Sequence, residues 1–393
     1  MPEFPFPGRA VRTLMTMPCE DVGVGRTCRS ILSASRAAGL ACDLFTSALR
    51  GDRPAGLSVH SVMPPGLARL PFGLVRRFAE PALHRRFLAS LGEGDIAYLW
   101  PSVPVAVYES LARRGIPIIA ESVNTRMEAA KPVLDAAYAS LGLPPAHDIT
   151  EARIAEQNRR QALCTAIFAP SPATERAFAG TEVADRIVPA SYGTWVPKTL
   201  PARPPREPGA PVVFVFVGAV CVRKGAHRLL EAWRRPPEGA VLRLVGDIEP
   251  VIRARFADVL ASDGVSSIGF SRNVVAELLG ADVALLPSLE EGDPIATYEA
   301  AAHGLPVIAS EAGAGRIGAE TGAITVVDPD DIEALRGALA CFAGSEELRR
   351  DRGAAARQAA LGYDWSRVGP LRFVRLFEKL GRSLGARAPA PGL

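Results

Sequence analysis

The sequence predicts an α/β protein made of two domains, each built around a parallel β-sheet. Short apolar runs alternate with amphipathic segments in both halves of the chain, as in consecutive β-α-β units. A segment with six prolines, residues 196–211, separates the two series and is typical of a linker. With 393 residues, of which 48% are hydrophobic, the chain can form two cores. We expect a first domain over residues 1–195 and a second over residues 212–365.

The apolar runs and amphipathic segments locate the individual elements. In the first domain we expect strands at residues 11–17, 41–45, 95–100, 116–120 and 166–169. Segments with helical spacing of apolar residues predict helices at residues 26–38, 103–114 and 151–163. In the second domain we expect strands at residues 212–218, 241–246, 266–270, 282–288, 305–310 and 323–327. The end of the chain, residues 366–384, predicts one more amphipathic helix.

Composition excludes several classes of protein. No apolar run reaches the roughly 18 residues of a membrane span, and no signal peptide opens the chain, so we expect a cytoplasmic protein. A net charge of +3 gives no case for nucleic-acid binding. The six cysteines are scattered without a C-x-x-C pair, which favours reduced thiols over disulfides or metal ligands.

The segment from residue 288 to residue 310 carries the strongest functional signal. It places Glu291 and Glu299 eight residues apart across a predicted loop-to-helix junction, with Pro294 in the first helical turn and Gly304 closing the helix. A helix N-terminus offers unpaired N–H groups and a partial positive charge, which suit a phosphate. Glu299 can face the same crevice and accept hydrogen bonds from hydroxyls. Together these features predict a sugar-nucleotide site.

This segment resembles the Glu-x7-Glu signature of the retaining glycosyltransferases of family 4. The matching positions are Glu291, Glu299, Ala300, Ala302, Gly304, Pro306 and Ile308. The resemblance implies the GT-B fold, in which two Rossmann-like domains face each other and the last helix, here residues 366–384, crosses back to the first domain. A disordered tail over residues 385–393 would follow. The resemblance also implies transfer of a sugar from a UDP- or GDP-sugar, with retention of configuration, to a glycan, lipid-linked or small-molecule acceptor.

The resemblance gives roles to residues of the motif. Glu299 would bind the ribose hydroxyls and Glu291 would contact the transferred sugar. The donor would also meet Gly292 and the amides of Ile295 and Ala296. Asp293 departs from the family pattern: as an N-cap it competes with a phosphate for N–H groups, so it either turns to a sugar hydroxyl or weakens donor binding.

A basic turn follows the first strand of the second domain and reads Gly218-Ala219-Val220-Cys221-Val222-Arg223-Lys224-Gly225. Ligands of open α/β sheets lie beyond the carboxyl ends of the strands, so Arg223 and Lys224 can meet a diphosphate. The turn resembles the family's G-R-x-x-x-x-K-G turn, whose basic residues stabilise the leaving diphosphate. Ala219 stands where the family has Arg. Gly246, after the next strand, resembles the family's nucleotide-base loop.

Two loops of the first domain complete the predicted site. Gly23 and Gly25 follow the first strand and resemble the family's glycine-containing loop, which faces the donor diphosphate and the acceptor. After the strand at residues 116–120, Asn124 and Arg126 stand near the position where many relatives carry a histidine. No cofactor and no metal is expected, because the cations replace a metal and no Asp-x-Asp pair is placed for one.

The stretch from residue 66 to residue 91 suggests a possible peripheral contact with the inner face of the membrane. It holds five arginines among Leu and Phe, with Glu80 as the only acidic residue. Pro71 and Pro81 are expected to break it into short pieces, so an ordinary solvated helical face is the favoured interpretation.

Three alternatives to a transferase remain open. Ala219 and Asp293 are compatible with a catalytically weak scaffold or regulator that holds a nucleotide-sugar. A dehydrogenase on the same Rossmann units is disfavoured because a full G-x-G-x-x-G is absent, with Cys28 at the third position. A phosphorylase of the same fold would need a lysine that binds pyridoxal phosphate, and the chain has only four lysines.

Overall fold

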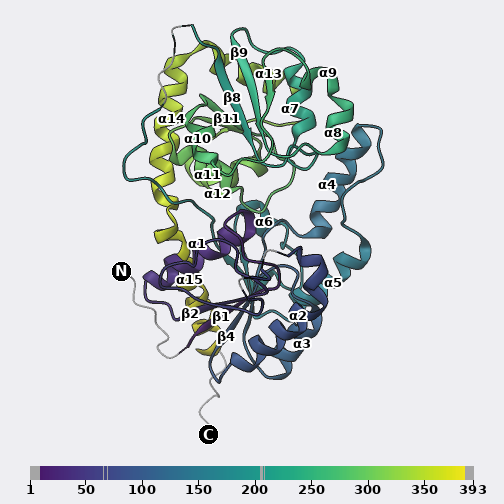
Figure 1. Ribbon diagram of the computed structural model, residues 1–393, viewed down its shortest axis with the longest axis vertical. Coiled ribbons are helices and arrows are strands. Elements are labelled where there is room, and N and C mark those ends of the chain that lie inside the picture. Colours follow the sequence, from purple (N-terminus) through teal and green to yellow (C-terminus); the bar gives the residue numbers. More distant parts are fainter. Residues whose placement is uncertain (1–8, 65, 69, 204–206, 208, 386–393) are drawn as a thin grey trace.

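The computed structural model describes residues 9–64, 66–68, 70–203, 207 and 209–385. Two parallel sheets form two domains that face each other (Figure 1). The expected tail lies outside the described residues from residue 386 onward, and so does Arg69 of the basic stretch. No helix among the described residues is long and apolar enough to cross a membrane.

The first domain holds a seven-stranded sheet in the order β3-β2-β1-β4-β5-β6-β7. Its strands are β1 (Val11–Met15), β2 (Cys42–Thr46), β3 (Ser58–Ser61), β4 (Ile96–Leu99), β5 (Ile118–Glu121), β6 (Ala166–Ala169) and β7 (Ile187–Pro189). Its helices are α1 (Gly23–Ala37), α2 (Phe72–Ser90), α3 (Val105–Arg113), α4 (Met127–Ser140), α5 (Glu151–Ala162) and α6 (Pro172–Arg176).

The second domain holds a six-stranded sheet in the order β10-β9-β8-β11-β12-β13. Its strands are β8 (Val212–Val217), β9 (Ala240–Val245), β10 (Val265–Ser267), β11 (Val283–Leu286), β12 (Val307–Ala309) and β13 (Thr325–Val326). Its helices are α7 (Ala226–Trp233), α8 (Pro250–Arg255), α9 (Ala257–Leu260), α10 (Val274–Leu279), α11 (Ile295–Ala302), α12 (Glu311–Thr321), α13 (Ile332–Gly344) and α14 (Glu346–Ala360). The strand order of each sheet reverses at its first strand, as in doubly wound Rossmann-like folds.

All eleven predicted strands are present, and two further strands were missed. β3 is a four-residue edge strand with the sequence SVHS, in which only Val59 is buried, so it has no apolar run. β7 is three residues long and ends in Pro189. The helix predicted from residue 26 begins three residues earlier, so Gly23 and Gly25 lie in its first turn and not in a loop.

The prediction that prolines break residues 66–91 into short pieces was wrong. α2 runs without interruption through Pro81. A proline removes one intrahelical hydrogen bond, but a helix can continue past it when packing compensates. Here Ala79, Leu83 and Phe87 form a buried stripe that holds α2 against the first sheet.

The last helix, α15 (Trp365–Gly385), leaves the second domain and returns to the first. It packs against α1 and β7, and Figure 1 shows it descending from α14 into the lower domain. Its Arg372 side chain is fully buried and donates to Glu121 Oε2 (2.9 Å), Tyr98 Oη (3.0 Å) and the Ser191 carbonyl (3.0 Å). The first domain therefore includes a segment from the end of the chain.

Candidate functional site

The loops that follow β5 and β11 touch each other between the two domains. The Thr125 amide donates to Glu290 Oε1 (2.9 Å), and the Thr125 hydroxyl donates to the Glu291 carbonyl (3.0 Å). A Cβ on Gly292 would lie 1.8 Å from the Val123 carbonyl oxygen, so only glycine permits this approach. The loop that carries the first glutamate of the motif is thus packed directly on the first domain.

Glu291 is buried and held by two cations from the turn after β8. Its carboxylate pairs with Lys224 Nζ, lies 3.3 Å from Arg223 Nη1, and accepts from Ser288 Oγ at 3.0 Å. Burial alone would raise the pKa of Glu291, but Lys224 and Arg223 outweigh it and hold that pKa below its ordinary value. The structure therefore brings Glu291, Arg223 and Lys224 together, although they lie 67 and 68 residues apart.

A second buried carboxylate, Glu290, stands beside the first and was missed by the sequence analysis. Its Oε2 lies 3.5 Å from Arg223 Nη1, and its backbone carbonyl accepts from the same nitrogen at 3.1 Å. Burial raises the pKa of Glu290 despite the opposing effect of Arg223. Two neighbouring carboxyl groups with opposite shifts differ in their affinity for a proton, which is a common property of functional sites.

Glu299 faces the first domain from α11. Its Oε1 lies 2.9 Å from Nη1 of Arg26, which stands in the first turns of α1. The Glu299 side chain is 13% exposed and that of Arg26 is 41% exposed. Burial raises the pKa of Glu299, and Arg26 partly counteracts this rise. The ion pair crosses the gap between the domains at the carboxylate expected to hold a ribose.

A cavity of about 920 Å³ opens between the domains beside these carboxylates. Asn124 and Thr125 line it from the first domain, and Arg223 and Glu290 line it from the second; Glu299 lies outside it. One wall is α4, whose Tyr138 hydroxyl donates to Glu249 Oε1 at 2.6 Å. Ala137 and Tyr138 also join the apolar core of the second domain, so α4 joins the two domains along this wall.

The chain is similar to known proteins in both sequence and fold. Residues 211–343 match the family model described as glycosyl transferases group 1. The second domain is a glycosyl transferases group 1 domain. Over 97% of both chains, this glycosyltransferase is 25% identical to D-inositol 3-phosphate glycosyltransferase of Pseudarthrobacter chlorophenolicus.

Solved structures show the same fold for nearly the whole glycosyltransferase chain. WaaG, a glycosyltransferase involved in lipopolysaccharide biosynthesis, superposes with a TM-score of 0.64 at 17% identity, covering 92% of this chain and 98% of WaaG. HepE from Anabaena, determined with UDP and glucose, gives a TM-score of 0.63 at 15% identity, with coverage of 96% and 100%. The architecture is therefore GT-B, as the sequence predicted.

The predicted glycines of this glycosyltransferase serve close backbone contacts. A Cβ on Gly246 would lie 2.0 Å from the Gly218 carbonyl oxygen, and both residues have positive φ. A Cβ on Gly25 would lie 2.5 Å from the Glu20 carbonyl oxygen, while Gly23 has a φ of 51°. These contacts bring the turns after β8 and β9 together and fit the start of α1 against the preceding loop.

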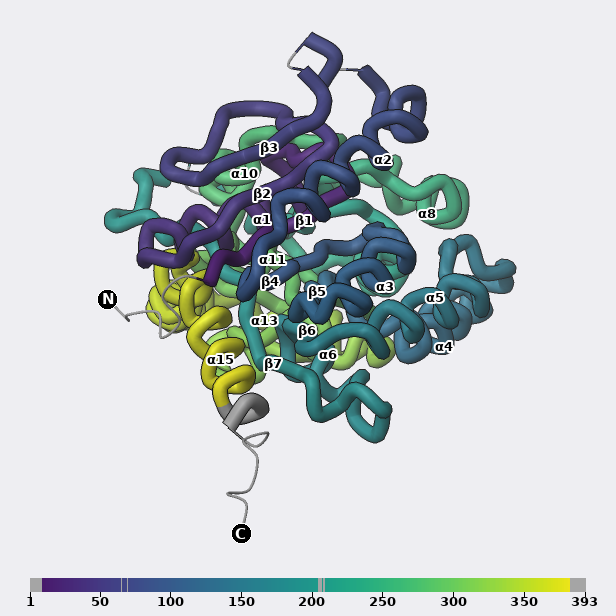
Figure 2. Tube along the Cα trace, turned by 90° about the horizontal axis from the view of Figure 1, so that it is seen from below, coloured from purple at the N-terminus to yellow at the C-terminus, as the bar shows by residue number. Residues whose placement is uncertain are grey.

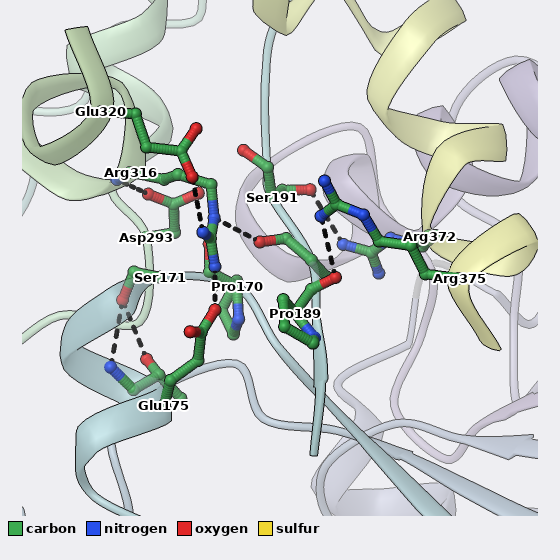
Figure 3. Close-up of polar contacts among 12 residues, drawn as sticks. Pro170, Ser171, Glu175, Pro189, Ser191, Asp293, Arg316, Glu320, Arg372 and Arg375 are labelled. Carbon is green, nitrogen blue, oxygen red and sulfur yellow. Dashed lines mark hydrogen bonds and ion pairs between the residues drawn. The ribbon is translucent and has the colours of Figure 1, made fainter. Parts of the chain in front are cut away.

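The expectation for Asp293 was wrong. Its carboxylate is buried and does not cap α11; it accepts from the amides of Tyr192 (2.8 Å) and Arg316 (3.0 Å) and from the Tyr298 hydroxyl. Figure 3 shows it beside Arg316. Pro294 precedes α11 and is not part of it, while Ile295 and Ala296 form its first turn. Asp293 therefore ties the second domain to the first and adds no exposed charge beside a donor.

Arg126 was also wrongly expected to face the acceptor. Its guanidinium is buried within the first domain, where it donates to Gln161 Oε1 (3.2 Å) and Asn158 Oδ1 (2.7 Å) and lies over the Phe178 ring. Asn124, in contrast, is exposed and lines the cavity. Arg26 was missed as a site residue, although its place directly after the Gly23–Gly25 segment was a usable signal.

Proposed function

We propose that this glycosyltransferase moves a sugar from a nucleotide-sugar to an acceptor with retention of configuration, as a member of family 4. The observation that carries the proposal is the cluster of Glu291 with Arg223 and Lys224 next to the cavity, with Glu299 across the domain gap from Arg26. UDP is the favoured nucleotide because HepE, which shares the fold, binds UDP and glucose.

In the proposed reaction the protein acts through charge and position. Arg223 and Lys224 would offset the negative charge that develops on the departing diphosphate, so that no metal is required. Their present partners, Glu290 and Glu291, hold both cations at the edge of the gap before the donor arrives. Glu299 would accept hydrogen bonds from the ribose, and Glu291 would orient the transferred sugar.

A thermal-shift panel with UDP, GDP, ADP and their sugar conjugates tests the donor site. A nucleotide at 100 times its dissociation constant should stabilise the protein by about 2.7 kcal/mol. We expect this shift in the wild type and in Glu333→Ala, a variant of an exposed glutamate on α13. Glu299→Ala should lose the shift while its own unfolding temperature stays close to that of the wild type. An unchanged nucleotide response in Glu299→Ala would remove Glu299 from the site.

The stereochemical part of the proposal needs a separate measurement. Once a donor is known, its slow hydrolysis or transfer can be followed by NMR, and the first product should keep the anomeric configuration of the donor. Inversion would contradict the family 4 mechanism while leaving donor binding intact.

Ala219 supports one competing function. The family's turn has an arginine at this position, whereas Ala219 carries no charge. The missing charge fits a scaffold that binds a nucleotide-sugar without catalysing its transfer. Asp293 no longer supports that alternative, because it is buried away from the donor. If the wild type turns over a nucleotide-sugar and Lys224→Ala does not, the protein is an enzyme and the scaffold function is ruled out.

A further inference from the structure

The segment that leads into α2 exposes an unusual group of large apolar side chains. Leu67, Leu70, Leu74 and Phe78 are 51%, 40%, 70% and 67% exposed. The opposite side of α2 already supplies the core with Ala79, Leu83 and Phe87, so the exposed side chains are not part of that core. Single exposed apolar residues are normal, but four within twelve residues indicate a surface that contacts something.

Arginines surround these apolar side chains. Arg77 places its guanidinium 4.6 Å from the centre of the Phe78 ring, and Arg85 is exposed two turns further along the helix. Arg76 is also exposed and pairs with Glu80 (2.7 Å), the only acidic residue between residues 66 and 91. The surface thus combines positive charge with apolar groups and has little negative charge of its own.

We propose that this surface, defined by Leu67, Leu70, Leu74, Arg77, Phe78 and Arg85 and called the α2 face, docks on the anionic headgroups of a lipid bilayer. Leucine and phenylalanine side chains can enter the boundary between headgroups and acyl chains while arginines contact lipid phosphates. Charge complementarity favours a lipid surface. In Figure 2 the segment before α2 projects from the first domain, which leaves it free to meet a flat surface.

Arg76, from the same turns of α2, lines the cavity between the domains from the side of the helix opposite Leu74 and Phe78. A bilayer on the α2 face would therefore lie about one helix diameter, roughly 10 Å, from the edge of the cavity. This suits an acceptor that is anchored in lipid, a consequence that rests on the proposed transferase function. The docking itself does not depend on that function.

Co-sedimentation with vesicles tests the docking. The full-length wild type should pellet with phosphatidylcholine vesicles that contain phosphatidylglycerol and should stay in solution with pure phosphatidylcholine. Leu74→Ser/Phe78→Ser should bind at least about tenfold more weakly, since it removes the apolar anchors. Arg77→Gln/Arg85→Gln should lower the affinity for these vesicles about fivefold per arginine and should remove much of the salt dependence of binding.

The matched control is Val326→Ser/Arg350→Gln, which changes an exposed apolar and an exposed basic residue of the second domain. It should bind vesicles like the wild type. The proposal is overturned if the wild type ignores phosphatidylglycerol, if the α2 variants still pellet, or if they instead abolish self-association seen by sedimentation velocity. Nucleotide thermal shifts on the same variants should stay unchanged, which separates failure of docking from failure of the donor site.

Discussion

Arg26 of the first domain and Glu299 of the second form an ion pair across the domain gap, with Nη1 and Oε1 2.9 Å apart. The carboxylate predicted to bind a ribose is therefore already held by a cation from the opposite domain. A donor that binds Glu299 has to share this carboxylate with Arg26 or displace the Arg26 side chain. The charge of Glu299 therefore depends in part on a cation that the other domain supplies.

Replacing Arg26 should change the pH dependence of nucleotide binding. Burial raises the pKa of Glu299 and Arg26 lowers it, so Arg26→Ala should let that pKa rise further. Since the ionised form accepts hydrogen bonds from the ribose, affinity should fall on acidification at a higher pH in Arg26→Ala than in the wild type. Calorimetric titration with UDP over a pH series checks this, with Arg26→Lys retaining most of the wild-type profile. Identical profiles for all three proteins would show that Arg26 does not govern the charge of Glu299.

Removing the Tyr138 hydroxyl should weaken the wall of the cavity. Tyr138 donates to Glu249 Oε1, and Glu249 Oε2 accepts from the Val222 amide (2.8 Å) in the basic turn. Loss of one such hydrogen bond costs about 1 kcal/mol, so Tyr138→Phe should lower the free energy of unfolding in urea by about that amount and leave the nucleotide Kd unchanged. Tyr108→Phe, a change on α3 in the same cavity lining, is the control. Equal effects of both variants would contradict a role for the α4 contact.

Asp293 should give the protein a pH-dependent stability. Burial raises the pKa of Asp293 to about 6, although three hydrogen-bond donors, the amides of Arg316 and Tyr192 and the Tyr298 hydroxyl, oppose the rise. A raised pKa means that the stabilising contribution is fully present below the unfolded pKa of about 3.8 and is lost as the pH rises to the folded value of about 6. The difference in unfolding temperature between wild type and Asp293→Ala should therefore shrink from about pH 4 to about pH 6. A difference that grows over this interval would mean that the carboxyl group is stabilised in its ionised form.

Breaking the buried pair between Arg372 and Glu121 should destabilise the whole protein. Both side chains are fully buried, so Arg372→Met leaves an unpaired carboxylate and should cost about 3–5 kcal/mol. Urea unfolding measures this, and Arg372→Met/Glu121→Gln should recover part of the loss. Arg375→Met, on the same helix but bonded to the Pro189 carbonyl, should have a small effect. If the double variant is as unstable as Arg372→Met, unpaired charge is not the cause.

The sequence predicted the fold well because buried parallel strands need apolar runs, and those runs are easily recognised. β3 and β7 were not predicted because short strands at the edges of a sheet do not need such runs. The core of the site, Glu291 with Arg223 and Lys224, could be predicted because each residue lies in the turn or loop that follows a predicted strand.

The errors came from partners that are distant in the sequence. Local rules gave Asp293 the role of a helix cap, but the Tyr192 amide, 101 residues away, binds it instead. Arg126 was expected to face the acceptor, yet Asn158 and Gln161, 32 and 35 residues away, hold it in the first domain. Glu290 was overlooked because its contacts with Thr125 and Arg223, which distinguish it from a solvated neighbour of Glu291, join residues far apart in the sequence.

The return of α15 to the first domain affects how the protein can be made. During synthesis the residues of the first domain leave the ribosome before α15 exists, so Glu121 has no Arg372 and α1 lacks the helix that packs on it. Domains usually fold as units while the chain grows, with the N-terminal one first. Here the first domain can reach its final form only after Arg372 has emerged. A ribosome that stops before α15 would release a chain with an open core and an uncompensated charge, which chaperones or proteases can recognise as incomplete.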